Sequence, residues 1–419
     1  MRGLRVGSLF SGIGALDIAV HNLLPDSETV WFVEQNDFCQ KLLRKRFPDA
    51  LIYNDVREVS RDNLAPIDIL VGGFPCQDIS TAGQGAGISK ETRSGLFFEM
   101  WRIAQELQPR VVLFENVPAI TIRGLDTVAE IICSSGWTIE WFALSASDVG
   151  AWHRRERWWG IAHREPQPLF GQYETIGELQ DGWRTLQQGL FGSPSIIERM
   201  PRSGMVRDGL LYERPQSKIS SGWFNTPNTM DHLPRREGEA MERCLSRGEG
   251  GSKRDRSGNL REDKRLCYPT PTVSDYKDSN TEHDVRYQVK RRGANARLGT
   301  VVSARMNGLL PTPVRNDGHD HRSEVKEQEW LPGKLNPDWV EPLMGLPSGY
   351  TDLERDIAPY MIEVSSWKDG SWEEDLPRLT DKKDNRVSRI QSLGNSVVPQ
   401  CAFEAYSIIR EILKGELCD

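Results

Sequence analysis

The side chain with the clearest chemical potential in this sequence is Cys76, in the run Gly72-Gly73-Phe74-Pro75-Cys76-Gln77. Cysteine is a strong nucleophile that is partly thiolate near neutral pH. The seven cysteines stand at positions 39, 76, 133, 244, 267, 401 and 418, and none forms a C-x-x-C pair. This spacing favours neither a zinc site nor a redox motif and predicts free thiols. Because a cysteine is more often a small buried hydrophobic residue, location must decide the role of Cys76.

Three further side chains could work beside a nucleophile. Glu115 follows about forty residues after Cys76, within Phe114-Glu115-Asn116-Val117. Arg155 and Arg157 stand two residues apart. A carboxyl group can donate or accept a proton, and a guanidinium can hold a carbonyl or phosphate oxygen. Each of these arginines could equally form a surface ion pair.

Strands alternate with helices from residue 1 to about 163. The pattern predicts strands at 4–10, 30–33, 51–53, 67–71, 111–114, 137–144 and 157–162, and helices at 15–24, 38–47 and 96–107. Such alternation predicts an α/β fold with a doubly wound, mostly parallel sheet. Ligands of these sheets bind beyond the carboxyl ends of the strands. The residues that fall at those ends are Gly12, Glu34, Asp55, Cys76 and Glu115.

The first strand runs into Phe10-x-Gly12-x-Gly14, which has the glycines of a cofactor loop. Glycines let a backbone approach a ligand closely, although a lone G-x-G is more often an ordinary turn. Glu34 could bind ribose hydroxyls and Asp55 an adenine amino group, or either could be a surface carboxylate. Their order and common location favour a cofactor site.

The chain has 419 residues, enough for two domains or one large domain with an insertion. No apolar run approaches the ~20 residues that a membrane-spanning helix needs, and the first residues lack the pattern of a signal peptide. We therefore expect a cytoplasmic protein without membrane contacts. The net charge of −7 argues weakly against nucleic-acid binding, but Arg286 to Arg305 holds six Lys or Arg and no acidic residue. Such a run either holds phosphates or is a solvated loop.

Periodicity is lost from about 164 to 330, where Gly, Pro, Arg and Ser dominate. A Thr-Pro-x-x-x-Asp pattern recurs there and is either a structural repeat or chance: Thr226–Asp231, Thr270–Asp275 and Thr312–Asp317. A helical block with Trp339 and Leu343 on one face is predicted at 335–347, and a last helix at 402–413.

Five segments follow one another in a fixed order: FSGIGALD (10–17), GGFPCQDIS (72–80), FENV (114–117), RRER (154–157) and LGNSVVP (393–399). In sequence and order they resemble the motifs of the DNA cytosine-5 methyltransferases of bacterial and phage restriction-modification systems. The most specific part is Pro-Cys-Gln followed by Glu-Asn-Val. The resemblance implies the Rossmann-like fold of S-adenosylmethionine-dependent methyltransferases, with a smaller irregular target-recognition domain.

The resemblance implies methyl transfer to C5 of a cytosine in double-stranded DNA. C5 is a poor nucleophile, and addition of the Cys76 thiolate to C6 makes it able to attack a methyl donor. Glu115, protonated in a closed pocket, would donate a hydrogen bond or a proton to N3 of the ring. Arg155 and Arg157 would hold the cytosine O2 and nearby groups, and Asn116 would orient the site. The target base would have to be flipped out of the duplex.

The resemblance also assigns the binding residues. Those expected to hold S-adenosylmethionine, which becomes S-adenosylhomocysteine, are Phe10, Gly12, Gly14, Glu34, Asp55, Val56, Pro75, Leu96 and Asn395. Ser80 is expected to contact the target phosphate, Arg291 and Arg292 to contact DNA, and Gln77 to Arg93 to form a mobile catalytic loop. No metal is expected.

The resemblance predicts a catalytic, cofactor-binding domain at 1–165 and 390–419 and a target-recognition domain at 166–389. Two departures from the family pattern concern local detail: Trp152-His153 replaces the usual Pro-Gln, and Gly14-Ala15 replaces a frequent Gly-Gly. We expect a monomer that acts on double-stranded DNA, with a separate restriction endonuclease as an open partner. A tRNA-methylating relative and a non-catalytic DNA-binding homologue are the alternatives.

Overall fold

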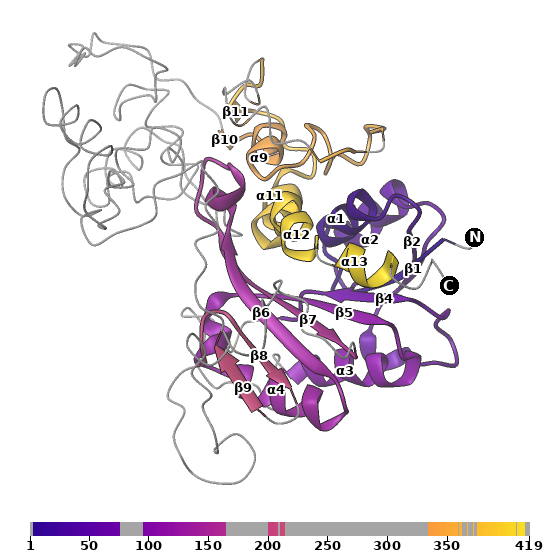
Figure 1. Cartoon of the computed structure of the whole chain (residues 1–419). Helices are drawn as coiled ribbons and strands as arrows, with labels where there is room; N and C mark the ends of the chain where they lie inside the picture. The colour runs from indigo at the N-terminus through magenta and orange to yellow at the C-terminus, as the bar shows by residue number, and fades with distance from the viewer. Residues whose placement is uncertain are drawn as a thin grey trace, which may run out of the picture.

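The structure of this chain is a computed structural model (Figure 1). It describes residues 3–75, 95–164, 200–207, 210–213, 334–358, 360–362, 367, 372, 375–407 and 409–414. Several residues and segments singled out from the sequence lie outside this part of the chain: Cys76, Ser80, Arg291, Arg292, the stretch 77–93, the basic run 286–305 and the three Thr-Pro-x-x-x-Asp segments.

The described residues build one nine-stranded sheet in the order β3-β2-β1-β4-β5-β7-β6-β8-β9. Its strands are β1 (Arg5–Leu9), β2 (Glu28–Val33), β3 (Leu51–Tyr53), β4 (Ile69–Gly72), β5 (Val111–Asn116), β6 (Thr138–Ser145), β7 (Glu156–His163), β8 (Gly204–Arg207) and β9 (Leu210–Glu213). Pairing is parallel from β3 to β5 and antiparallel from β5 to β9. The predicted α/β fold with a mostly parallel sheet is confirmed.

The register of the parallel part forms a straight row at its carboxyl edge. Tyr53 pairs with Val33, Val33 with Leu9, Leu9 with Gly72, and Gly72 with Phe114. The residues that follow this row in each strand therefore emerge side by side, which is where parallel sheets bind their ligands.

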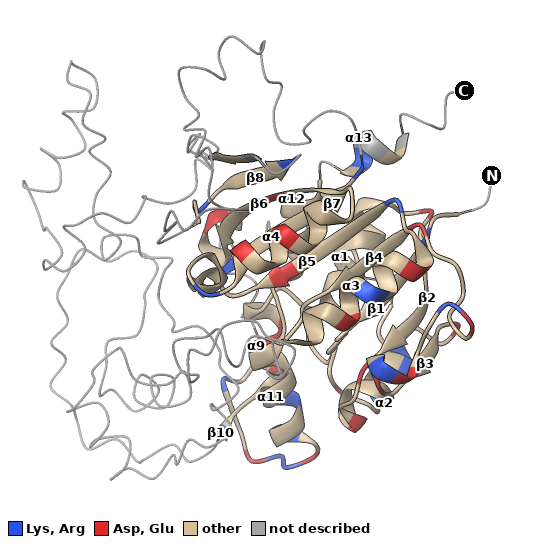
Figure 2. Cartoon of the chain, turned by 90° about the horizontal axis from the view of Figure 1, so that it is seen from below, with Lys and Arg blue, Asp and Glu red and all other residues tan. Residues whose placement is uncertain are grey.

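Helices cover both faces of the sheet. Along β5, Val111 and Leu113 belong to one hydrophobic cluster, while Val112 and Phe114 belong to the other. This alternation, buried on both sides, is typical of a parallel strand between two helical layers. One layer is formed by α1 (Ala15–Leu23), α2 (Asp37–Arg46) and α12 (Pro399–Tyr406), and the other by α3 (Leu96–Leu107) and α4 (Leu125–Ser134). The view from below shows α3 and α4 in front of β1, β4 and β5 (Figure 2).

The C-terminal part differs from the sequence prediction. It contains β10 (Lys334–Leu335), α9 (Pro337–Leu343), β11 (Leu379–Thr380), α11 (Arg386–Asn395), α12 and α13 (Ile409–Lys414). The single helix predicted at 402–413 is wrong. Pro399 starts α12 earlier, since proline suits the first helical position, and the Ser407 hydroxyl bonds the Glu404 carbonyl at its end.

The block around α9 packs on the same side of the sheet as α1. Trp339 and Leu343, which were predicted to lie on one helix face, are both fully buried and share one hydrophobic cluster with α1, α11 and α12. Residues 334–389 were assigned from the sequence to the target-recognition domain, so part of that assignment packs directly on the core of the catalytic elements. The division of the chain into domains stays a prediction.

A helix that crosses a bilayer needs about 20 predominantly apolar residues. No helix within the described ranges reaches that length and apolar character.

A buried carboxyl group joins α1 to the sheet beside the first strand. Asp17 is fully buried and accepts hydrogen bonds from the hydroxyls of Ser8 and Thr29, each 2.9 Å long. The Nε2 atom of His21 lies 3.0 Å from the same Thr29 hydroxyl. Burial raises the pKa of Asp17 to about 7, against the lowering effect of the two hydroxyls. The folded protein therefore holds a proton here that the unfolded chain releases above about pH 4.

Asp17→Asn should change how stability depends on pH. In the wild type, the contribution of Asp17 is fully present below about pH 4 and is lost as pH rises to about 7. This window of about three pH units corresponds to roughly 4 kcal/mol. Because the amide does not titrate, the variant should gain stability relative to the wild type between pH 4.5 and 7.5 in urea unfolding. Asp26→Asn, at an exposed side chain, is the control for charge, and parallel curves for Asp17→Asn and wild type would contradict the expectation.

Candidate functional site

A pocket of about 570 Å³ lies at the carboxyl edge of the parallel strands. Its floor comes from the ends of β1, β2, β4 and β5, and residues of α11 and the turn after it form a further wall. The residues predicted to bind the cofactor or to catalyse that line this pocket are Phe10, Gly12, Glu34, Val56, Pro75, Leu96, Asn395, Glu115, Arg155 and Arg157. Gly14 and Asp55 do not line it.

The loop after β1 adopts an unusual backbone. Phe10, Gly12 and Gly14 have φ angles of 54°, 55° and 78°, all in the left-handed region. For Phe10 this conformation is costly, so surrounding contacts must impose it. At Gly14 a side chain is also excluded by packing, because an added Cβ would lie 2.8 Å from the ring of Phe47. Gly14 thus shapes the turn into α1 rather than the pocket surface.

Glu34 stabilises this loop from the next strand. Its carboxylate accepts a hydrogen bond from the backbone N–H of Gly12 at 2.7 Å and from that of Asn36 at 2.8 Å. Each carboxylate oxygen can accept further bonds. Glu34 can therefore hold the loop and still accept hydrogen bonds from the hydroxyl groups of a ligand in the pocket.

The Asp55 side chain forms a hydrogen bond with the backbone in this structure. Its carboxylate accepts from the N–H of Arg57 at 2.9 Å and so caps the short 3-10 helix η1 (Val56–Glu58). Asn54, one residue earlier, lines the pocket. The predicted contact of Asp55 with an adenine stays a prediction, and Asn54 is a polar group in this region that the sequence analysis did not select.

Glu115 occupies the centre of the candidate catalytic group. Its Oε1 lies 2.9 Å from Nε of Arg157, and the two side chains are 14% and 20% exposed. Burial raises the pKa of Glu115 above its ordinary value, although Arg157 and Arg155 act in the opposite direction. The site therefore favours a carboxyl group that can carry a proton while it remains hydrogen-bonded to an arginine.

Gly73 makes room for this carboxyl group. A Cβ at position 73 would lie 2.8 Å from Oε2 of Glu115, a distance that side chains essentially never show. The reason is the register, because Gly73 and Glu115 each follow a residue of the paired row in neighbouring strands. The glycine is thus required by close approach to Glu115.

Asn116 ties the two strand ends together. Its Nδ2 donates to the carbonyl of Phe74 at 3.2 Å, and its Oδ1 accepts from the N–H of Val117 at 2.8 Å. The Asn116 side chain is 2% exposed. It fixes the backbone two residues before Cys76, which agrees with an orienting role.

The two predicted arginines have different surroundings. Arg155 is 5% exposed, and its guanidinium donates to the carbonyl oxygens of Gly394, at 2.9 Å, and of Ser396. These contacts hold the C-terminal end of α11, which includes Asn395, against the residue that precedes β7. Arg157 contacts Glu115 instead. Arg155 therefore acts on the wall of the pocket and Arg157 on the carboxyl group inside it.

His153, at one of the departures from the family pattern, is a structural residue here. It is 1% exposed, and its Nε2 lies 3.1 Å from the Leu343 carbonyl in α9. Since a carbonyl only accepts, Nε2 carries the proton. Burial lowers the pKa of His153 to about 3, with Arg155 contributing in the same direction, so the ring is neutral at physiological pH.

The pocket fits a nucleoside-sized ligand with a charged end. Its volume falls within the range of roughly 300–1,000 Å³ that small-molecule sites occupy. The aromatic ring of Phe10, the carboxylate of Glu34 and the amides of Asn36 and Asn395 offer both a flat apolar contact and hydrogen-bonding groups. Within the described ranges, no group of three His, Cys, Asp or Glu is arranged to hold a metal ion.

Sequence reasoning missed the contribution of α11. Ser388, Gln391 and Ser392 line the pocket from this helix, in addition to the predicted Asn395. The signal was present, because Arg386, Arg389, Ile390 and Leu393 recur at helical spacing and are buried. Two of these four residues are arginines, so the buried face of α11 does not show a purely apolar helical period.

Known proteins similar to this chain were identified by sequence and by fold. The sequence profile described as C-5 cytosine-specific DNA methylase matches residues 4–356. The type II methyltransferase M.CviJI of Paramecium bursaria Chlorella virus IL3A is 36% identical over 170 residues, which are 39% of this chain and 45% of that protein. The orphan methyltransferase M.SPRI of Bacillus phage SPR is 34% identical over 171 residues, which are 39% of each. Each match therefore spans less than half of the relative's length.

A solved structure that the chain matches comes from Spodoptera frugiperda. It is a mutant of DNMT2 that superposes with a TM-score of 0.49 at 16% sequence identity, over 98% of this chain and 100% of that chain.

Gly73→Ala should displace the Glu115 carboxyl group and break its contact with Arg157. We expect the turnover number for methyl transfer to DNA, the activity that the motifs imply, to fall at least about tenfold, the effect of losing about 1.4 kcal/mol. Gly72→Ala is the matched control, because its Cβ would meet the Leu9 carbonyl at 2.9 Å and Met100 at 3.1 Å but not Glu115. It should lower the melting temperature more and the turnover number less. The reverse ranking would show that Gly73 matters for folding alone.

Proposed function

The chain belongs to the C-5 cytosine-specific DNA methylase family, and on that basis we propose that it transfers a methyl group from S-adenosylmethionine to C5 of a cytosine in a specific double-stranded DNA sequence. The observation that carries the proposal is Glu115, held by Arg157 at the end of β5, beside the strand end that leads into Pro75 and Cys76. The motif resemblance supplied the same family from sequence alone, and the profile match confirms it.

The proposed nucleophile is Cys76. The preceding residue, Pro75, lines the pocket, which supports this proposal. The Cys76 thiolate adds to C6 of the target cytosine, and the electron pair of the C5–C6 bond becomes available at C5. When bound, S-adenosylmethionine supplies an electrophilic methyl group, which C5 takes up. The C5 proton then passes to water, the C5–C6 double bond re-forms, and Cys76 leaves as a thiolate.

Glu115 is proposed to interact with N3 of the cytosine ring while the Cys76 thiolate adds to C6. The thiolate adds negative charge to the ring, and a protonated carboxyl at N3 neutralises it by a hydrogen bond or proton transfer. Burial raises the pKa of Glu115, which favours that protonated form. Arg157 holds the other side of the carboxyl group at 2.9 Å and so fixes its direction.

The arginine pair is proposed to complete the pocket. Arg157 would reach the cytosine O2, which is supported by its contact with Glu115 and its place in the pocket lining. Arg155 holds the carbonyls of Gly394 and Ser396 and keeps Asn395 at the pocket wall. Arginine suits this role because its planar guanidinium can donate in two directions at once.

The donor is proposed to bind along the ends of β1, β2 and β4. Phe10 would stack on the adenine, Glu34 would accept the ribose hydroxyls, and Pro75, Leu96 and Asn395 would line the remainder. Val56 lies at the same wall, and Gly12 leaves its side of the pocket open, since an added Cβ there would meet no atom within 4 Å. Gly14 and Asp55 support the site through the turn and through η1.

DNA recognition is proposed for the segment 166–389, with Ser80 at the target phosphate and Arg291 and Arg292 at other phosphates. Because C5 is stacked inside the duplex, the target base must be flipped into the pocket. The protein would act as a cytoplasmic monomer on double-stranded DNA, and a separate restriction endonuclease would act on the same sequence. Methylation of tRNA instead of DNA would favour the alternative hypothesis, a tRNA methyltransferase of the same fold.

Cys76→Ser should lower methyl transfer by on the order of a thousandfold or more and leave DNA binding intact, because only the nucleophile is lost. Wild-type protein should form a covalent adduct with a cognate duplex carrying 5-fluorocytosine, since fluorine at C5 blocks the final elimination. Cys133→Ser is the matched control, because that half-buried thiol lies outside the pocket lining. Full activity of Cys76→Ser, or an adduct with it, would exclude the mechanism.

Replacement of Arg291 and Arg292 by Gln should weaken DNA binding for all sequences to a similar extent. If each contacts one phosphate, the slope of the logarithm of the binding constant against the logarithm of salt concentration should fall by about 2 in magnitude. Fluorescence anisotropy between about 50 and 300 mM salt, over which the Debye length shortens roughly 2.4-fold, measures it. An unchanged slope would remove the basic run 286–305 from the proposed interface.

A further inference from the structure

The segment from Gly345 to Asp356 reaches the loop that carries Phe10, Gly12 and Gly14. Tyr350 is 3% exposed, and its hydroxyl donates to the carbonyl of Ile13 at 2.8 Å. The contact joins residues 337 positions apart in the chain. Ile13 itself lines the pocket.

The Phe10–Gly14 loop needs such support because its backbone is strained. Phe10, a non-glycine residue, has a φ angle of 54°, a conformation that costs on the order of 1–3 kcal/mol unless surrounding contacts impose it. The loop is held by Val33 at the N–H of Phe10, by Glu34 at the N–H of Gly12 and by Tyr350 at Ile13. The first two contacts come from β2 and the residue after it, and the third comes from the C-terminal part of the chain.

Arg46 fixes the backbone around Tyr350 from the end of α2. Its guanidinium donates to four carbonyl oxygens: Gly349 at 3.1 Å, Tyr350 at 2.7 and 2.9 Å, Asp352 at 2.9 Å and Arg355 at 2.8 Å. Its Cζ also lies 5.4 Å from the centre of the Tyr350 ring. A planar guanidinium satisfies several converging carbonyls at once, which the single ammonium of lysine cannot do in the same geometry.

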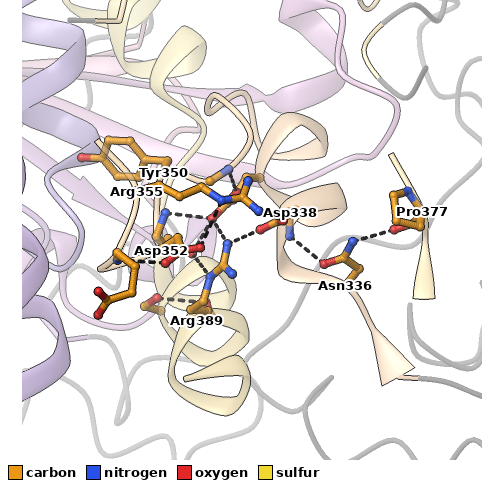
Figure 3. A network of polar contacts seen from close by, with 12 residues as sticks. Asn336, Asp338, Tyr350, Asp352, Arg355, Pro377 and Arg389 are labelled. Carbon is orange, nitrogen blue, oxygen red and sulfur yellow. Dashed lines mark hydrogen bonds and ion pairs between the residues drawn. The ribbon is translucent and has the colours of Figure 1, made fainter. Parts of the chain in front are cut away.

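Glu341 and Arg389 fix the same turn from α9 and α11. The buried Glu341 carboxylate accepts from the N–H groups of Gly349 and Thr351 and from the Thr351 hydroxyl. Arg389 donates to Glu341 at 2.8 Å, to Asp338 at 2.6 Å and to the Thr351 hydroxyl at 2.8 Å. Figure 3 shows this network with Tyr350 beside it. Burial costs for Glu341 and Arg389 are offset only while both partners stay in place.

The network also reaches the part of the pocket that α11 lines. Arg389 lies in α11 between Ser388 and Gln391, both of which line the pocket. One polar network therefore bonds to the cofactor loop through Tyr350 and to the pocket-lining helix through Arg389. Arg46, Tyr350 and Arg389 lie outside the five motif segments singled out in the sequence.

We propose that Tyr350 is a positioning residue for the methyl donor, which sets the Phe10–Gly14 loop through the Ile13 carbonyl and is itself held by Arg46, Glu341 and Arg389. The proposal rests on the proposed function, since it takes the ligand of this loop to be S-adenosylmethionine. Tyr350 does not line the pocket, so it acts through the loop and not by contact with the ligand.

Tyr350→Phe removes the hydroxyl and keeps the ring. Isothermal titration with S-adenosylhomocysteine, on the full chain without DNA, should show a dissociation constant raised roughly five- to tenfold, the effect of one lost hydrogen bond. In steady-state assays the KM for S-adenosylmethionine should rise by a similar factor, while kcat and the KM for DNA stay within about twofold. The split between KM and kcat separates positioning of the donor from a general loss of folded protein.

Tyr406→Phe is the matched control. Its hydroxyl also donates to a buried carbonyl, that of Phe114 at 2.9 Å, but this carbonyl belongs to β5 and not to the cofactor loop. It should lower the melting temperature as much as Tyr350→Phe and leave the dissociation constant unchanged. Equal dissociation constants for wild type and Tyr350→Phe, or equal rises in both variants, would overturn the proposal. Failure of the wild type to bind S-adenosylhomocysteine would instead contradict the proposed function.

Arg46→Lys tests the support of Tyr350 by the network. It should also weaken binding of S-adenosylhomocysteine, and the double variant Arg46→Lys with Tyr350→Phe should bind no more weakly than Arg46→Lys alone. Non-additivity of this kind is expected when two residues act through one contact. Full additivity of the two effects would overturn the claim that Arg46 acts through Tyr350.

Discussion

Parallel pairing of five strands with their ends in register is the constraint on which this site depends. The row from Tyr53 through Val33, Leu9 and Gly72 to Phe114 is straight, so the next residue of each strand emerges at one edge. Four functional residues from segments far apart in the chain meet at that edge: Phe10, Glu34, Gly73 and Glu115. A slip of one residue in any strand would turn its functional side chain to the opposite face of the sheet.

Electrostatics at Glu115 result from two opposing effects. Removal from water favours the neutral acid, and the two nearby arginines favour the carboxylate. Burial prevails, yet Arg157 stays within 2.9 Å, so the group can move between protonation states without losing its orientation. Arg155 donates to the carbonyls of Gly394 and Ser396 and also acts on Glu115 through its charge.

The parallel part of the sheet was predictable because its signal is local. Each strand is a short apolar run that stops at a glycine or a carboxylate, and each motif residue follows such a run. The roles of Arg155 and Tyr350 were not predictable, since they arise from contacts across 239 and 337 residues that leave no periodic trace. The helix α11 was missed because its buried face carries arginines. One of them, Arg389, pairs with Glu341 and Asp338 of another helix.

The contact between Arg155 and the turn after α11 also sets the order in which the protein becomes functional during synthesis. The sheet from β1 to β7 ends at His163, and a chain emerging from the ribosome at about 5–20 residues per second can fold it early. The pocket wall that Arg155 holds is made more than 200 residues later. A nascent chain therefore cannot close this wall of the pocket until Gly394 and Ser396 have been made, on the order of ten seconds or more after β7.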